Sequence, residues 1–185
     1  MLNVISGILN GGAAPDLGAY EAISTITIGA GGASSITFSS IPQTYKHLQI
    51  RELSRNTRAA LASNNFITFN GDTGANYSWH GIQANGSSVS AVAGSNANLM
   101  LSTSVSNSTT ANVFSVAIYD ILDYSNTSKY KTLRILDGGD TNGAGFVDLW
   151  SGSWRSTSAI TSYSMYAQSG DYMQYSSFAL YGIKG

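Results

Sequence analysis

The chain has 185 residues and a formal net charge of −1, and only 10% of its residues are charged, against roughly 25% in a typical globular protein. Its polarity comes from uncharged groups, since 29 Ser, 15 Thr, 14 Asn and 20 Gly together make 78 residues. This composition excludes an electrostatic nucleic-acid surface, the lack of Cys excludes disulfides and thiolate sites, and no apolar run reaches the roughly 18 residues of a transmembrane helix.

Residues 1–19 are predicted to form an N-terminal arm ahead of a single domain that spans residues 20–185. The arm carries five aliphatic residues, which are Leu2, Val4, Ile5, Ile8 and Leu9. The first basic residue is Lys46, so the basic segment of a signal peptide is missing and no signal peptide is expected. Because aliphatic side chains are costly to leave in water, we predict that the arm anchors the protein in a neighbouring chain. A frayed terminus or a first strand of the domain is the alternative.

Apolar and polar residues alternate from Tyr20 to the C terminus, which is the period of half-buried strands. The predicted strands cover residues 20–28, 34–39, 46–53, 64–70, 77–84, 98–102, 113–119, 121–124, 131–136, 146–151, 159–168 and 177–183. Residues 54–62 are the one helix-compatible stretch. Residues 85–111 carry no charge and are predicted to form a long surface loop around the strand at 98–102. Short strands separated by turn signals predict an all-β protein with a single β-sandwich, jelly-roll-like in topology.

The ionisable residues form no recognisable catalytic pattern. No Gly-x-Ser-x-Gly motif occurs. Asp120 and Asp123 are three residues apart, which places them on opposite faces of a strand and not as a pair across a sugar. We interpret these two residues as turn caps or as ion-pair partners of Lys129, Lys131 or Arg134. The chain is therefore not expected to be an enzyme or to need a cofactor.

Residues 137–143 (DGGDTNG) are rich in oxygen ligands, but they depart from the spacing of an EF-hand calcium loop. Asp and Asn also form turns by bonding to their own backbone. We therefore predict a turn here and keep a Ca²⁺ site as the alternative. The two His residues, His47 and His80, are too few for a metal centre built on histidine.

Aromatic residues are numerous, with 11 Tyr, 6 Phe and 3 Trp. Large aromatic side chains dominate both protein cores and subunit interfaces, and they also stack on sugars. The residues singled out as candidates for recognition or for an interface are Trp79, Trp150, Trp154, Tyr163 and Tyr166.

Five stretches of the sequence support a resemblance, and they are residues 35–51, 69–78, 120–132, 151–160 and 177–185. In these stretches the chain resembles small β-rich structural proteins of tailed phages, of the type common in marine and cyanobacterial phages. The resemblance implies a virion protein assembled in the host cytoplasm, and first of all a capsid decoration (cement) protein. It would contact the major capsid protein or other virion proteins and form a homo-oligomer, expected to be a trimer.

The alternative within the virion is a tail or neck fibre tip that binds host surface glycans through the loop 85–111 and the exposed aromatic residues. The resemblance implies no catalytic residue. A carbohydrate-active enzyme is a third hypothesis, which the scarcity of acidic residues disfavours.

Overall fold

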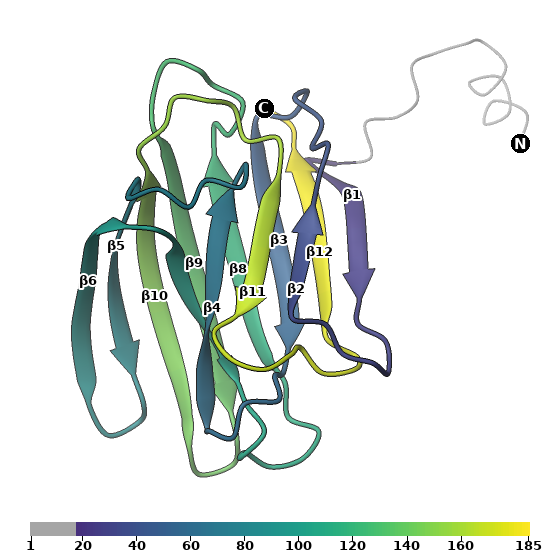
Figure 1. The fold of residues 1–185 in the computed structure, drawn as a ribbon, viewed down its shortest axis with the longest axis vertical. Coiled ribbons are helices and arrows are strands. Elements are labelled where there is room, and N and C mark those ends of the chain that lie inside the picture. The colour runs from purple at the N-terminus through teal and green to yellow at the C-terminus, as the bar shows by residue number, and fades with distance from the viewer. Residues whose placement is uncertain (1–17) are drawn as a thin grey trace, which may run out of the picture.

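The computed structural model describes residues 18–185, and the predicted anchor residues Leu2, Val4, Ile5, Ile8 and Leu9 lie outside the described residues. The described part folds into twelve strands in two antiparallel sheets that face each other as a sandwich (Figure 1). The prediction of an all-β sandwich is thereby confirmed, whereas the jelly-roll topology stays a prediction. Within residues 18–185 no helix is present that could span a membrane.

The large sheet has eight strands, in the order β1 (Tyr20–Thr27), β12 (Ser177–Ile183), β3 (His47–Ser54), β8 (Ser115–Leu122), β9 (Lys131–Asp140), β10 (Gly145–Trp154), β5 (Tyr77–Ala84) and β6 (Val89–Ala97). The small sheet has four strands, in the order β2 (Ser35–Phe38), β11 (Tyr163–Ala167), β4 (Ala62–Phe69) and β7 (Met100–Val105). The chain passes repeatedly between the sheets, so residues far apart in sequence meet in one core.

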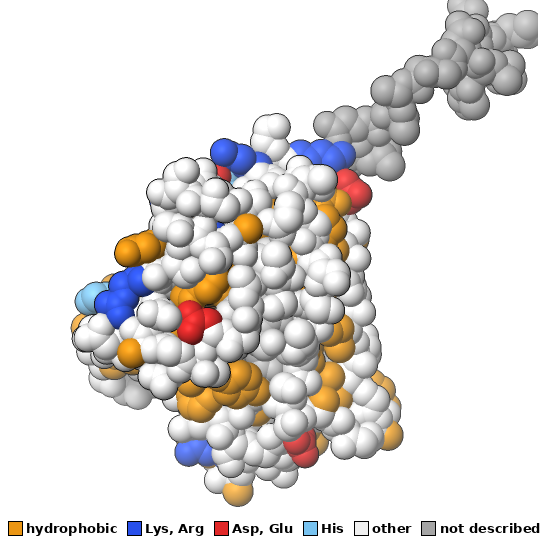
Figure 2. Space-filling view, turned by 45° about the horizontal axis from the view of Figure 1, so that its top comes forward, with side chains coloured by type: hydrophobic (Ala, Val, Ile, Leu, Met, Phe, Trp, Pro, Cys, Tyr) orange, Lys and Arg blue, Asp and Glu red, His pale blue; other side chains and the backbone are white. Residues whose placement is uncertain are grey.

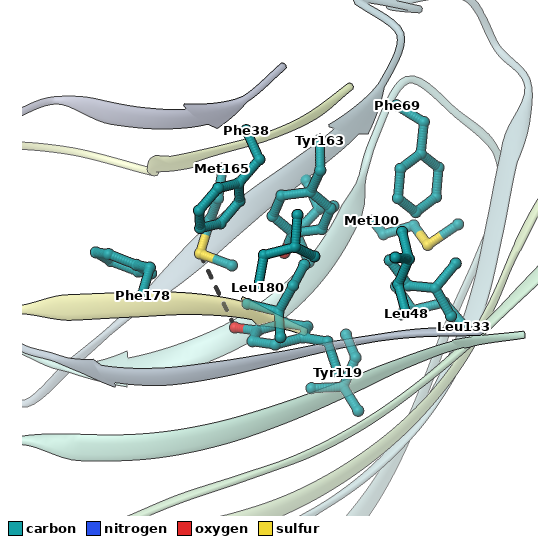
Figure 3. Packing of buried hydrophobic residues seen from close by; sticks show 14 of the residues in the cluster. Phe38, Leu48, Phe69, Met100, Tyr119, Leu133, Tyr163, Met165, Phe178 and Leu180 are labelled. Carbon is teal, nitrogen blue, oxygen red and sulfur yellow. Dashed lines mark hydrogen bonds between the residues drawn. The ribbon is translucent and has the colours of Figure 1, made fainter. Parts of the chain in front are cut away.

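The core fills the space between the two sheets. Figure 3 shows Tyr119 and Leu48 of the large sheet facing Tyr163 and Met165 of the small sheet. These side chains are fully buried, and the Tyr119 hydroxyl lies 3.9 Å from the Met165 sulfur. The alternation of buried and exposed residues along β8 therefore places every second side chain in this core, as a period of two requires.

The prediction of a long loop over residues 85–111 is wrong for residues 89–97, which form β6, whereas the strand expected at 98–102 corresponds in part to β7. β6 follows β5 through a tight turn in which the Asn85 side chain accepts hydrogen bonds from the backbone N–H groups of Ser87 and Ser88. β6 consists mostly of small residues, which carry little strand signal. Close packing requires one of them, since a Cβ on Gly94 would stand 2.4 Å from the Trp79 ring.

The interpretation of residues 54–62 as helix-compatible is also not realised. Ser54 belongs to β3, Ala62 begins β4, and Arg55 forms an isolated bridge to Val105. The buried Arg55 guanidinium donates hydrogen bonds to the carbonyls of Thr110 (2.8 Å) and Val113 (2.9 Å). These tertiary contacts hold the segment extended despite its local propensity.

Two smaller boundaries differ from the sequence-based expectation. The predicted strands 113–119 and 121–124 are one continuous strand, β8. The predicted turn at 137–143 is mostly strand, because β9 continues to Asp140 and the turn closes from the Thr141 N–H to the Ala144 carbonyl (2.8 Å). Asp137 consequently points into the core and is not part of an oxygen-lined calcium loop.

Candidate interaction surface

The aromatic residues predicted for recognition or an interface divide into two groups. Trp150, Trp154 and Tyr163 are at most 2% exposed and belong to the core, whereas Trp79 and Tyr166 are half-buried. The Trp150 ring lies against Gly81, where a Cβ would come within 2.4 Å of it. The three core residues therefore cannot stack on a sugar at the surface, and their prediction as part of an exposed recognition set is corrected here.

The motif around Trp154 holds one end of the sandwich together. Its indole N–H donates a hydrogen bond of 2.7 Å to Asp72, whose carboxylate also accepts hydrogen bonds from Gly74 (2.8 Å) and Asn76 (2.9 Å). Burial by itself raises the pKa of the Asp72 carboxyl, but these hydrogen bonds together outweigh it, so the pKa is lowered. Arg155 donates to the Ala75 carbonyl at 2.5 Å. Two of the stretches that carry the phage resemblance, 69–78 and 151–160, are therefore joined by a structural network.

The acidic residues at 120 and 123 form the ion pairs predicted for two of their three candidate partners. Arg134 lies 2.7 Å from Asp120, and Lys129 pairs with Asp123. Lys131 instead is buried, and its ammonium donates to the carbonyls of Asn126, Lys129 and Thr157.

A buried polar network occupies the space between the sheets at the opposite side of the core. The Glu52 carboxylate accepts hydrogen bonds from the hydroxyls of Ser54 and Tyr119 and from the Asn65 amide (2.9 Å). Burial raises the pKa of the Glu52 carboxyl in spite of these donors. No charged partner is bonded to it in this network, so the hydrogen bonds alone satisfy the carboxylate.

Asp137 and Asp148 form a second buried acidic pair, as direct neighbours across β9 and β10. The Thr103 N–H donates to Asp137 Oδ2 (2.6 Å) and the Thr103 hydroxyl donates to Asp148 Oδ2 (2.7 Å). Burial, reinforced by the Asp148 and Glu52 charges, raises the pKa of Asp137 to about 8. Burial beside a second carboxylate thus favours the protonated form of Asp137. The interaction of Asp137 with the Trp150 indole partly offsets this rise in its pKa, and Oδ1 of each carboxyl group is buried without a hydrogen bond to the described part of the chain.

A cavity of ≈ 430 Å³ adjoins this pair, and Asp148 is the one charged residue in its lining. The Asp148 oxygen Oδ2 already accepts hydrogen bonds from Thr103 and, at 3.1 Å, from Gln83. Among residues 18–185 no group of three or more acidic or histidine side chains is arranged to hold a metal ion. This geometry fixes the carboxylate in the fold and does not present it to a reacting group.

The surface feature that stands out is a part of the outer face of the large sheet, where two neighbouring rows of side chains directed away from the core are apolar. The first row across this face, which we name the long-side-chain row, is set by the strand registers and runs Ile118–Leu136–Leu149–Ile82 across β8, β9, β10 and β5. The next row, which we name the short-side-chain row, runs Val116–Gly138–Val147–Ala84 in the same order of strands. All four residues of the first row are between 42% and 54% exposed.

Neither row contains a charged or hydrogen-bonding side chain, and we name the two rows together the outer apolar face. Large aliphatic residues at its edges, Leu53, Val89 and Leu122, extend it. An antiparallel sheet that faces water on one side normally alternates apolar and polar residues. Over residues 116–119 β8 is apolar on both sides, and this run of apolar residues is the signal in the sequence for the two rows.

The remaining surface is predominantly uncharged. Figure 2 shows a side of the molecule on which charged groups are few and scattered between uncharged side chains and backbone. Such a surface offers little repulsion between copies of the chain. No protein family, curated protein or solved structure was found to match the chain.

Proposed function

We propose that the protein is a structural component of a bacteriophage virion, and first a capsid decoration protein that reinforces the head through contacts between subunits. The observation that carries the proposal is the outer apolar face, which spans four strands without a charge. Exposed apolar surfaces of this extent mark interaction sites. The phage resemblance supplies the kind of assembly, with the major capsid protein and copies of the chain itself as partners and no cofactor.

Decoration is a mechanical role that the described structure supports. A modest contact repeated over many copies gives a large total stabilisation of a shell. The sandwich offers a rigid body for this purpose, because loops at its ends are tied by side chains such as Asp72 and Lys131. Ala19 accepts a hydrogen bond of 3.0 Å from Lys184, so the arm would leave the sandwich beside its C-terminal strand.

The arm provides the experiment. Full-length protein and a variant without residues 1–18 are mixed with particles that lack the protein, and bound copies are counted after sedimentation. We expect the truncated protein to stay folded by circular dichroism and to lose binding. A truncated protein that decorates particles normally would refute the anchor, and a full-length protein that binds no particle at all would refute decoration.

A fibre tip that binds host glycans is the second candidate. The cavity beside Asp148 favours it, since its walls carry hydroxyl and amide groups together with Phe146, and Ser88 and Ser90 come from the stretch 85–111. Sugars bind through such a mixture of hydrogen-bonding groups and one apolar ring. A glycan array tests this candidate: binding that Phe146→Ala removes would support it, and an array without signal would reject it.

A further inference from the structure

We infer that the outer apolar face is covered by the same face of a second copy of the chain, about a twofold axis that crosses the strands at the level of Asp137. The inference deepens the proposed assembly role by naming a partner for this face. The inference rests on the proposed role because both concern the same surface. The dimer itself can be tested without any virus particle.

The two rows of the face are complementary in size. The long-side-chain row contributes Ile, Leu, Leu and Ile, and the short-side-chain row contributes Val, Gly, Val and Ala at the same four strands. A twofold axis that runs between the rows places the long-side-chain row of each copy over the short-side-chain row of the other. Each contact then joins a larger residue to a smaller one, as close packing between sheets requires.

The fit is sharpest at β9. Leu136 of one copy comes to lie over Gly138 of the second copy, and the second Leu136 lies over the first Gly138. Gly138 has no side chain, and together with Val116 and Val147 it lines one part of a surface hollow of ≈ 790 Å³ that extends to the turn between β9 and β10. Leu136 is 53% exposed and stands next to that hollow. The face thus carries both the projecting residue and the recess that receives it.

The same axis also brings opposite charges together. Arg134 and Asp140 lie on β9 three residues before and three residues after Asp137, and both face outward and are exposed. The axis therefore directs Arg134 of each copy towards Asp140 of the other, once on each side of the apolar rows. Within one copy Arg134 already contacts Asp120 at 2.7 Å, which orients its guanidinium along this rim. Isologous interfaces are self-complementary in this way.

The size of the face is sufficient for a dimer. With the flanking strands β3 and β6 and the charged residues Arg134 and Asp140 included, the contact crosses five strand intervals of about 4.8 Å and extends about 20 Å along the strands. Its footprint is on the order of 500 Å² in each copy, so both copies together reach the roughly 1,000 Å² that a specific interface needs. The interface expected from this geometry is twofold, so a trimer would need a different contact.

Sedimentation equilibrium of the full-length chain tests the inference directly. The wild type is expected to be a dimer at micromolar concentration. Leu136→Asp is expected to raise the dissociation constant at least about 100-fold, because it places two uncompensated charges in an apolar contact. Leu61→Asp is the matched control, since Leu61 is 60% exposed, lies outside the face and should leave the dimer intact. Thermal melts confirm that both variants are folded.

Three outcomes would overturn the inference. The first is a wild-type protein that is monomeric at about 100 μM, a concentration well above the dissociation constants of stable complexes. The second is a dimer that survives the substitution Leu136→Asp. The third is a dimer that dissociates when residues 1–17 are removed. The last result would mean that the arm and not a second face covers these rows. Failure to bind particles would bear on the proposed decoration role alone, because the dimer is measured in their absence.

Discussion

Replacement of Asp137 by Asn should stabilise the protein at neutral pH. The side-chain carbonyl of the introduced amide would accept the hydrogen bond that the Thr103 N–H now donates to Asp137, and its NH₂ group would be a donor beside Asp148, the direct neighbour across β9 and β10. The substitution keeps the shape of the side chain and the hydrogen bond from Thr103. It removes the one property that opposes folding, which is the tendency of a buried carboxyl to ionise beside a second carboxylate.

The magnitude follows from the pKa of Asp137, which rises from 3.8 to about 8 on folding. Because the pKa of Asp137 is higher in the folded state, its contribution to the free energy of unfolding is fully present below pH 4. That contribution is lost progressively as the pH rises to 8. A pKa difference of roughly four between the folded and unfolded states, at about 1.36 kcal/mol for each pKa unit, corresponds to a loss of at most about 5 kcal/mol in folding stability. The advantage of Asp137→Asn should therefore grow by several kcal/mol across this range.

Urea unfolding of both proteins at pH 4, 5, 6, 7 and 8 measures this difference. The pKa of Glu52 is raised as well, so both proteins should lose some stability with rising pH, and that shared slope cancels in the difference. Glu21→Gln is the control, since Glu21 is an exposed acid on β1, which lies outside the outer apolar face. If the difference in unfolding free energy between Asp137→Asn and the wild type stays constant from pH 4 to 8, the raised pKa of Asp137 is refuted.

Two further substitutions test the packing and the surface charges. Gly81→Ala should destabilise the fold by about 1–3 kcal/mol, because the new Cβ would stand 2.4 Å from the rigid Trp150 ring, and a lowered melting temperature checks it. Asp123→Asn should cost about 1 kcal/mol at pH 7, since Lys129 and Lys46, which hold the pKa of Asp123 down to about 2, are both more than half exposed. This cost should vanish as the pH falls from 4 to 2, and unfolding at pH 7 that matches the wild type would contradict the ion pairs.

The strands that the sequence predicts well are those with a clear alternation of large apolar and polar residues. The strand predicted at 177–183 has the observed bounds of β12, for example, and its Phe178 and Leu180 point into the core as a period of two demands. The sequence fails where strands are built from small polar residues. β6 consists mostly of Ser, Ala, Gly and Asn, and pairing with β5 makes it a strand.

The candidate surface could be predicted only in part. Apolar residues at successive positions 116–119 indicate a strand covered on both faces, but the rows across the face depend on register. The register is a property of two paired strands, so it cannot be predicted from the sequence of one strand alone. The aromatic residues illustrate the same limit, since parity along β10 fixes only that Trp150 and Trp154 share a face. The second sheet decides that this face is the core.

The low charge of the chain and its outer apolar face have the same consequence for association. Five of the few charged residues, namely Glu52, Arg55, Lys131, Asp137 and Asp148, are buried in the sandwich and bonded to polar groups there. The solvent-facing surface is therefore about as poor in charge as the sequence, of which 10% is charged. Repulsion between copies is correspondingly weak, and burial of the outer apolar face stabilises a contact wherever two copies meet. These two properties together favour an assembled state for this chain.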